Sequence, residues 1–188
     1  MKVRILFLIC FLSITCFLNA ADKPVIQIHT DNSSLIFRVA DNGRLYQSYL
    51  GKKLNHETDI SHLPQGTEAY ITHGMEDYFE PAIHILHNDG NPSLLLKYIS
   101  HETKAVSQGV NETIITLGDD KYPVTVKLHY VTYPAEDIIK TYTEISHKEK
   151  KPVVLHQYAS SMLHLNRAKY YLTEFSGCLL YTSPSPRD

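Results

Sequence analysis

The sequence predicts an all-β protein, and two observations carry that prediction. Apolar residues alternate with polar ones at period 2 in several short runs, as half-buried strands require. Turn-forming residues separate these runs, which is typical of a β-sandwich. In the clearest run, one face holds Val124, Val126, Leu128 and Tyr130, and the other holds Thr125, Lys127, His129 and Val131.

The same reading along the chain gives a succession of strands. The segment Asp41-Asn42-Gly43 tolerates positive φ and should join two antiparallel strands. Tyr133-Pro134-Ala135-Glu136 and the charged segment 147–152 are further turns. We expect strands at residues 25–29, 35–40, 45–50, 83–87, 94–98, 111–117, 124–131, 138–146 and 153–162.

Residues 54–76 interrupt this pattern. Their composition shifts to His, Asp, Glu, Thr, Pro and Gly, and no alternation remains. A loop of this length in a compact domain is commonly functional or poorly ordered. We therefore expect an irregular loop here.

The two ends of the chain have a different character from the middle. Lys2 and Arg4 precede an apolar run of 14 residues, and Ala20 suits cleavage before Ala21. We interpret residues 1–20 as a secretory signal peptide, because the run is too short to span a bilayer as a helix. Export to the periplasm or the extracellular space is expected. Residues 178–188 match one reading frame of a transposon-end sequencing adapter, so we interpret them as a scar, with a natural Ser/Pro-rich linker as the alternative.

The remaining domain, residues 21–177, is mildly acidic. Of the 18 Lys and Arg residues, Lys2, Arg4 and Arg187 lie in the two end segments, and of the 20 Asp and Glu residues only Asp188 does. The domain thus keeps 15 basic and 19 acidic residues, a net charge of −4, which gives no indication of nucleic-acid binding. All three cysteines, Cys10, Cys16 and Cys178, lie in the end segments, so neither a disulfide nor a cysteine-based metal site is expected in the domain.

Histidines are frequent, but their spacing does not indicate a metal site. Ligands on one strand should share a face, at positions i and i+2, and no pair of the 11 histidines has this spacing. His84 and His87 should point to opposite faces of their strand. We expect no metal.

Several motifs occur in an order that resembles the N-terminal domain of glycoside hydrolase family 36, the retaining α-galactosidases. The sequences of these motifs are most similar to those of secreted members from gut Bacteroidetes. The chain has L-x-x-x-Y-x-G-K from Leu45 to Lys52 and G-x-x-D-Y-x-x-P-A from Gly74 to Ala82. It then has the matching residues Val126, Leu128, Tyr130, Asp137, Ile139, Ser160, Ser161, Leu163 and Leu165, followed by the segment from Leu172 to Gly177.

The resemblance implies a galactose-mutarotase-like β-supersandwich that precedes a catalytic (β/α)8 barrel. The barrel, which carries both catalytic aspartates of the family, is expected to be missing from this chain. The chain would then be a non-catalytic part of an enzyme that hydrolyses terminal α-galactosyl residues from oligosaccharides, without a cofactor or a membrane span. The resemblance also implies a parent that forms homo-oligomers.

Two residues are candidates for sugar contact by this resemblance. In the family, a loop corresponding to residues 54–76 helps to wall off the sugar site, and Asp59 is the first candidate within it. Asp77 stands at the aspartate of the second motif, where its other role would be to cap a turn.

Two other functions remain open from the sequence. The chain could be a stand-alone carbohydrate-binding or mutarotase-like sandwich, because fold alone does not determine function. A mutarotase requires a His and a Glu positioned as acid and base, and the order of residues shows no clear pair. The third possibility is a structural sandwich without sugar chemistry.

Overall fold

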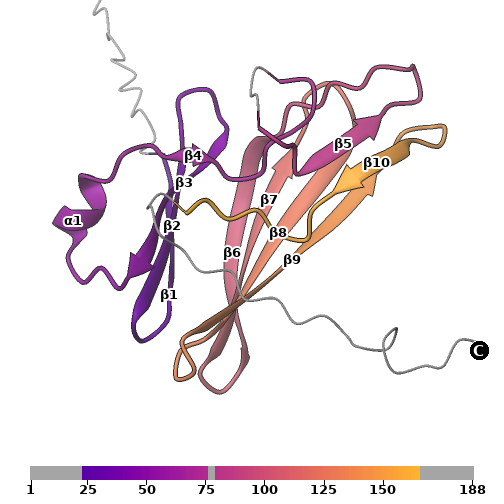
Figure 1. The fold of residues 1–188 in the computed structure, drawn as a ribbon. Helices are drawn as coiled ribbons and strands as arrows, with labels where there is room; N and C mark the ends of the chain where they lie inside the picture. The colour runs from indigo at the N-terminus through magenta and orange to yellow at the C-terminus, as the bar shows by residue number, and fades with distance from the viewer. Residues whose placement is uncertain (1–22, 76–78, 166–188) are drawn as a thin grey trace, which may run out of the picture.

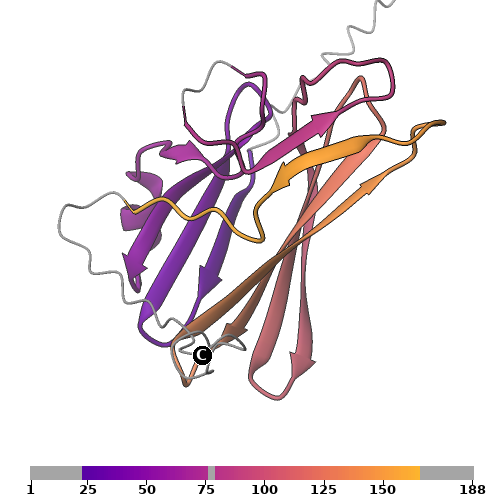
Figure 2. The same ribbon diagram turned by 45° about the vertical axis from the view of Figure 1, so that its right-hand side comes forward.

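Antiparallel strands make up most of the computed structural model, which describes residues 23–75 and 79–165. The expected signal peptide, the expected scar, Asp77 and the motif from Leu172 to Gly177 lie outside these residues. Two four-stranded sheets and a two-stranded ribbon form the domain (Figures 1 and 2). The strands are β1 (Val25–His29), β2 (Ser33–Val39), β3 (Leu45–Lys52), β4 (Thr67–Glu68), β5 (Ile83–Leu86), β6 (Lys97–Ser107), β7 (Val110–Gly118), β8 (Val124–Tyr133), β9 (Ile138–His147) and β10 (Val154–Tyr158).

Each four-stranded sheet follows the order of the chain. The first has the order β1-β2-β3-β4 and the second β6-β7-β8-β9, with every neighbouring pair antiparallel. The ribbon pairs β5 with β10, which are far apart in sequence. The only helix in the described part of the chain, α1 (Glu57–Ser61), lies beside the first sheet (Figure 1). In that same part, no helix is long and apolar enough to cross a bilayer.

The core lies between the two larger sheets and confirms the predicted sandwich. Phe37 of β2 is fully buried and its ring packs 5.1 Å from that of Tyr130 of β8, measured between centroids. Val124, Val126 and Leu128 are also buried, as the alternation in β8 predicts. In the second half of β8 both faces are buried, because polar side chains of neighbouring strands cover the outer face.

Two expected strands differ from those observed. The strand predicted over residues 153–162 covers only Val154–Tyr158. In the strand predicted over residues 94–98, Leu94 and Leu96 are buried, but as irregular chain. The strand begins at Lys97 and continues to Ser107. As the edge strand of its sheet, β6 is exposed along most of its length, so it lacks the alternation by which a half-buried strand is recognised.

The prediction of an irregular loop over residues 54–76 was also partly wrong. This stretch contains α1 and β4, and it places Ala69, Tyr70 and Ile71 in the interior. Gly66 is the residue that permits this path. Its φ is 83°, and a Cβ at this position would lie 1.9 Å from the backbone oxygen of Gln47. The chain therefore passes directly over β3, where only glycine fits.

Candidate functional site

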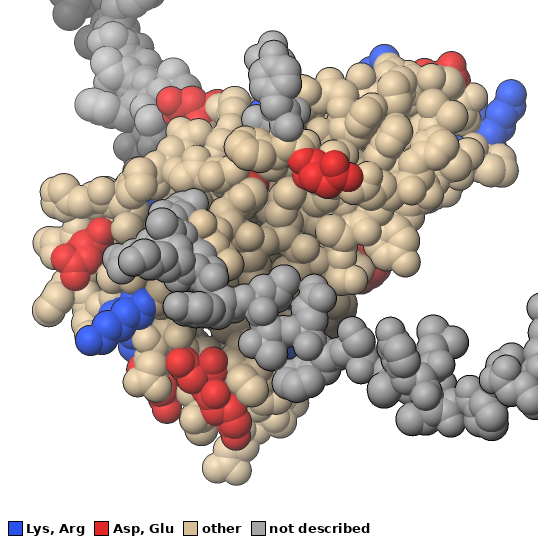
Figure 3. Space-filling view, viewed as in Figure 1, with Lys and Arg blue, Asp and Glu red and all other residues tan. Residues whose placement is uncertain are grey.

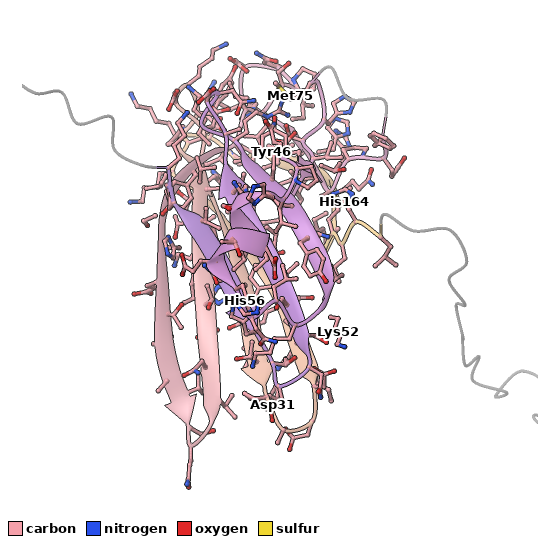
Figure 4. The ribbon with its side chains drawn as sticks, turned by 90° about the vertical axis from the view of Figure 1, so that its left-hand side faces the viewer. Asp31, Tyr46, Lys52, His56, Met75 and His164 are labelled. Carbon is pink, nitrogen blue, oxygen red and sulfur yellow. The ribbon has the colours of Figure 1, made fainter. Side chains whose placement is uncertain are left out.

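Only one of the two residues proposed for sugar contact lies in the described part of the chain. Asp59 is exposed in the first turn of α1. Asp77 lies outside the described residues, between Met75 and Phe79. His56, the N-cap residue of α1, and Met75 lie at different levels of the domain (Figure 4).

A cavity of about 220 Å³ lies next to Met75. Its wall includes Ser93, Asp119 and Tyr122. The Asp119 carboxylate accepts hydrogen bonds from the backbone N–H groups of Leu95 (2.5 Å), Lys121 (2.6 Å) and Tyr122 (2.9 Å). Asp119 therefore holds the turn before β8 and the entry to β6 in place, which is a structural role.

Three histidines come together on the ribbon. The rings of His73 and His84 stack with centroids 3.7 Å apart, and His156 of β10 lies 4.8 Å from His84. Burial and the two neighbouring imidazoles lower the pKa of His84. Stacked rings do not direct their nitrogens at one point, and the described residues contain no group of three or more side chains that could hold a metal ion. Spacing along one strand missed this cluster because its members come from three separate segments.

The order of residues shows no clear His–Glu pair, but the structure brings His and Glu side chains together at two places. His87 at the end of β5 contacts Glu149 through Nδ1 (2.7 Å) and the backbone oxygen of Ser93 through Nε2 (3.1 Å). Its ring stacks on Tyr122 with centroids 3.5 Å apart. Glu149 also accepts from the backbone and side chain of Asn88. Both nitrogens of His87 are thus occupied by protein groups, and the ring is buried.

A second pair lies on the outer face of the larger sheet. His129 of β8 contacts Glu112 of β7 through Nδ1 (2.9 Å) and stacks on Tyr142 of β9, whose hydroxyl donates to the same carboxylate (2.6 Å). The hydrogen bonds from Tyr142 and His129 lower the pKa of Glu112 to about 2, although burial opposes this shift. A carboxylate with so low a pKa is a weak base, and its hydrogen bonds are already taken by Tyr142 and His129, so this pair does not provide the acid and base of a mutarotase.

The register of the strands explains why sequence reasoning did not find this second pair. His129 stands directly opposite Tyr142 and also opposite Ile114, so that Glu112 is its diagonal neighbour. The diagonal relation can be recognised only when the register of β7 against β8 is known. The His87–Glu149 pair joins residues 62 positions apart, and no local pattern indicates it.

Asp137, one of the residues that carry the family resemblance, joins the two large sheets. It lies in the turn between β8 and β9 with a φ of 55°. Its carboxylate accepts hydrogen bonds from the hydroxyl of Thr30 and the backbone N–H of Asn32, in the turn between β1 and β2, and from the hydroxyl of Ser33, the first residue of β2. These bonds, led by the one from Thr30, lower the pKa of Asp137. The residue locks one turn against the other.

Comparison with known proteins identifies the family. The family model described as the glycosyl hydrolase family 36 N-terminal domain matches residues 38–179. The chain belongs to this family. No curated protein sequence is similar enough to count as a match.

Solved structures support the fold at low sequence identity. An α-galactosidase from Lactobacillus brevis is 17% identical with a TM-score of 0.63, over 74% of this chain and 23% of that one. The galactosidase domain of the α-galactosidase-sucrose kinase AgaSK is 20% identical with a TM-score of 0.65, over 73% and 24%. The family 36 α-galactosidase AgaA of Geobacillus stearothermophilus, solved with raffinose, is 18% identical with a TM-score of 0.65, over 73% and 24%. The chain therefore spans about a quarter of the length of the structures it matches.

Proposed function

We propose that the chain is the non-catalytic N-terminal domain of a retaining α-galactosidase that removes terminal α-galactosyl residues from oligosaccharides. The observation that carries this proposal is the family match over residues 38–179. Solved relatives of the same fold are α-galactosidases, and AgaA variants have been solved with raffinose and stachyose. The catalytic residues would lie in a barrel that follows this domain.

Within the parent enzyme, the domain would pack on the barrel and contribute to the rim of the sugar site. Asp59 and Asp77 remain the proposed rim residues. The mutarotase-like alternative has less support, because the partners of His87 and His129 are protein groups. We also propose that residues 1–20 direct export and that the parent forms homo-oligomers.

The test is to recover the uninterrupted gene by reading through the junction at residue 177, express the whole protein and assay the release of galactose from raffinose. The proposal expects a barrel with two aspartates, activity that disappears when either aspartate is replaced, and the product in the exported fraction. A natural stop codon near residue 188 would refute it. So would a full-length protein that releases no sugar from any α-galactoside.

A further inference from the structure

The segment that follows β10 connects the ribbon to the first sheet. Residues 159–165 cross in front of the gap between the two larger sheets and reach β3, as both ribbon views show (Figures 1 and 2). Ala159 begins this path with a hydrogen bond from its N–H to the oxygen of Ala82 (2.7 Å). His164 lies at its far end, beside the strands of the first sheet (Figure 4).

The far end of the segment is held by one side chain that hydrogen-bonds to both backbone groups of a residue in the segment. Gln47 of β3 is fully buried, and its amide donates to the oxygen of His164 (2.7 Å) and accepts from the N–H of His164 (3.1 Å). The His164 ring also contacts the oxygen of Glu68 through Nε2 (2.7 Å). The segment is therefore fixed in orientation relative to the sheet.

This fixed orientation turns two leucines outward. Met162 packs against the core and His164 faces β3 and β4, whereas the intervening Leu163 is 45% exposed and Leu165 is 54% exposed. Both leucines belong to the S-S-x-L-x-L motif of the family resemblance. The stability of this domain does not account for them, because exposed leucines bury little surface.

Other exposed apolar side chains lie on β10 and on the chain just before β5, the strand that pairs with β10. Of the eleven large hydrophobic residues that are exposed in the described part of the chain, six belong to β10, to the segment after it or to the chain just before β5. They are Phe79, Val154, Leu155, Tyr158, Leu163 and Leu165. The view of this side shows mostly uncharged surface over β5 and β10 (Figure 3). A charge-poor surface with exposed aromatic residues is typical of the centre of a protein interface.

One polar side chain among these residues already has partners. The amide of Gln157 on β10 donates to the Glu80 carboxylate (2.9 Å) and to the oxygen of Pro81 (3.0 Å). Covering this surface would therefore not leave the Gln157 amide without hydrogen bonds. An apolar partner fits it better than a charged one.

We propose that Phe79, Val154, Tyr158, Leu163 and Leu165, together called the β10 surface, form the docking surface for the domain that follows in the parent polypeptide. The proposal rests on the proposed function, since it requires a longer parent. The solved structures that the chain matches are about four times as long as the matched part. Leu165 lies on the docking surface itself, so the following chain starts beside it and holds its partner at a high effective concentration.

The experiment compares hydrogen–deuterium exchange in the recovered full-length parent and in the 188-residue chain. We expect amides of residues 154–165 to exchange at least about tenfold more slowly in the parent, because docking raises the free energy of local opening of this segment. In the parent, Leu163→Ser and Tyr158→Ser should return the exchange toward the rate in the isolated chain. Val106→Ser is the matched control, because Val106 is 58% exposed at a bulge of β6, away from this surface.

Each alternative to docking of a following domain predicts a different exchange result. Equal exchange in the parent and the isolated chain would overturn the proposal. Protection in the 188-residue chain that grows with its concentration would assign the surface to a second copy. If raffinose slows exchange in the 188-residue chain, the β10 surface binds sugar and not a following domain. Hydrolysis of raffinose by the parent tests the proposed function separately, so a failure of docking and a failure of activity can be distinguished.

Discussion

Replacing Gln47 by Leu should release the segment after β10 while leaving the core filled. Leucine occupies a similar volume but cannot make the two hydrogen bonds to the backbone of His164. Each neutral hydrogen bond contributes about 0.5–1.5 kcal/mol, and both groups of His164 would lose their partner, so we expect a loss of about 2 kcal/mol. In a protein of this size, that loss lowers Tm by about 4–8 °C.

The assay combines thermal unfolding, followed by circular dichroism, with amide exchange at His164. The control is Tyr46→Phe in the same strand, which removes only the exposed hydrogen bond from Asn42 to the Tyr46 hydroxyl (2.8 Å). This control should leave Tm unchanged, because exposed polar contacts contribute little to stability. Wild-type Tm and unchanged exchange at His164 in Gln47→Leu would show that the amide does not hold the segment.

Three further substitutions test the packing, the backbone and the charge cluster. Phe37→Ala should cost about 3–5 kcal/mol in urea unfolding, since it opens a cavity between the sheets, and a loss below 1 kcal/mol would contradict this packing. Gly66→Ala should reduce the yield of folded protein, because its Cβ would meet the Gln47 oxygen at 1.9 Å, whereas Gly90→Ala, where a Cβ meets nothing within 4 Å, should be milder. The pKa of Glu112 falls from 4.5 to about 2 on folding, so its contribution to stability is present above pH 4.5 and is lost as pH falls through about 2. Glu112→Gln should therefore destabilise the protein at pH 7 and flatten the decline in acid, as urea titrations from pH 7 to pH 2 would show, and parallel curves for the two proteins would contradict this account.

The strands that could be predicted are those with one face in the core. β1 and the first half of β8 alternate because one face packs in the core and the other is more exposed, and the alternation of apolar and polar residues in the sequence follows from this difference. β6 gave no such pattern, since its residues are held by backbone hydrogen bonds to β7 and not by burial. An edge strand can thus be long without any sign of it in the distribution of apolar residues.

The functional groupings were harder to predict because they depend on register and on contacts between distant segments. The stack of His73, His84 and His156 unites three segments, and the spacing rule for one strand could not find it. The interior position of Tyr70 was also unexpected, because the polar residues around it dominate the composition of its segment. Tyr70 is buried with its hydroxyl bonded to the oxygen of Ala159, so the polar tip of the side chain is satisfied by the segment after β10.

The residues that carry the family resemblance fall into two physical groups. Val126 and Leu128 lie in the core, and Asp137 locks two turns together, so the stability of this domain alone accounts for them. Leu163 and Leu165 are pinned to the first sheet through His164 and yet expose about half of their surface. Holding apolar side chains rigidly in water stabilises nothing by itself, because the hydrophobic contribution comes only with burial. A rigid apolar row does lower the entropic cost of forming an interface, since its side chains are already positioned. The arrangement is therefore what a domain requires to receive a neighbour, and the exchange experiment on residues 154–165 tests this requirement directly.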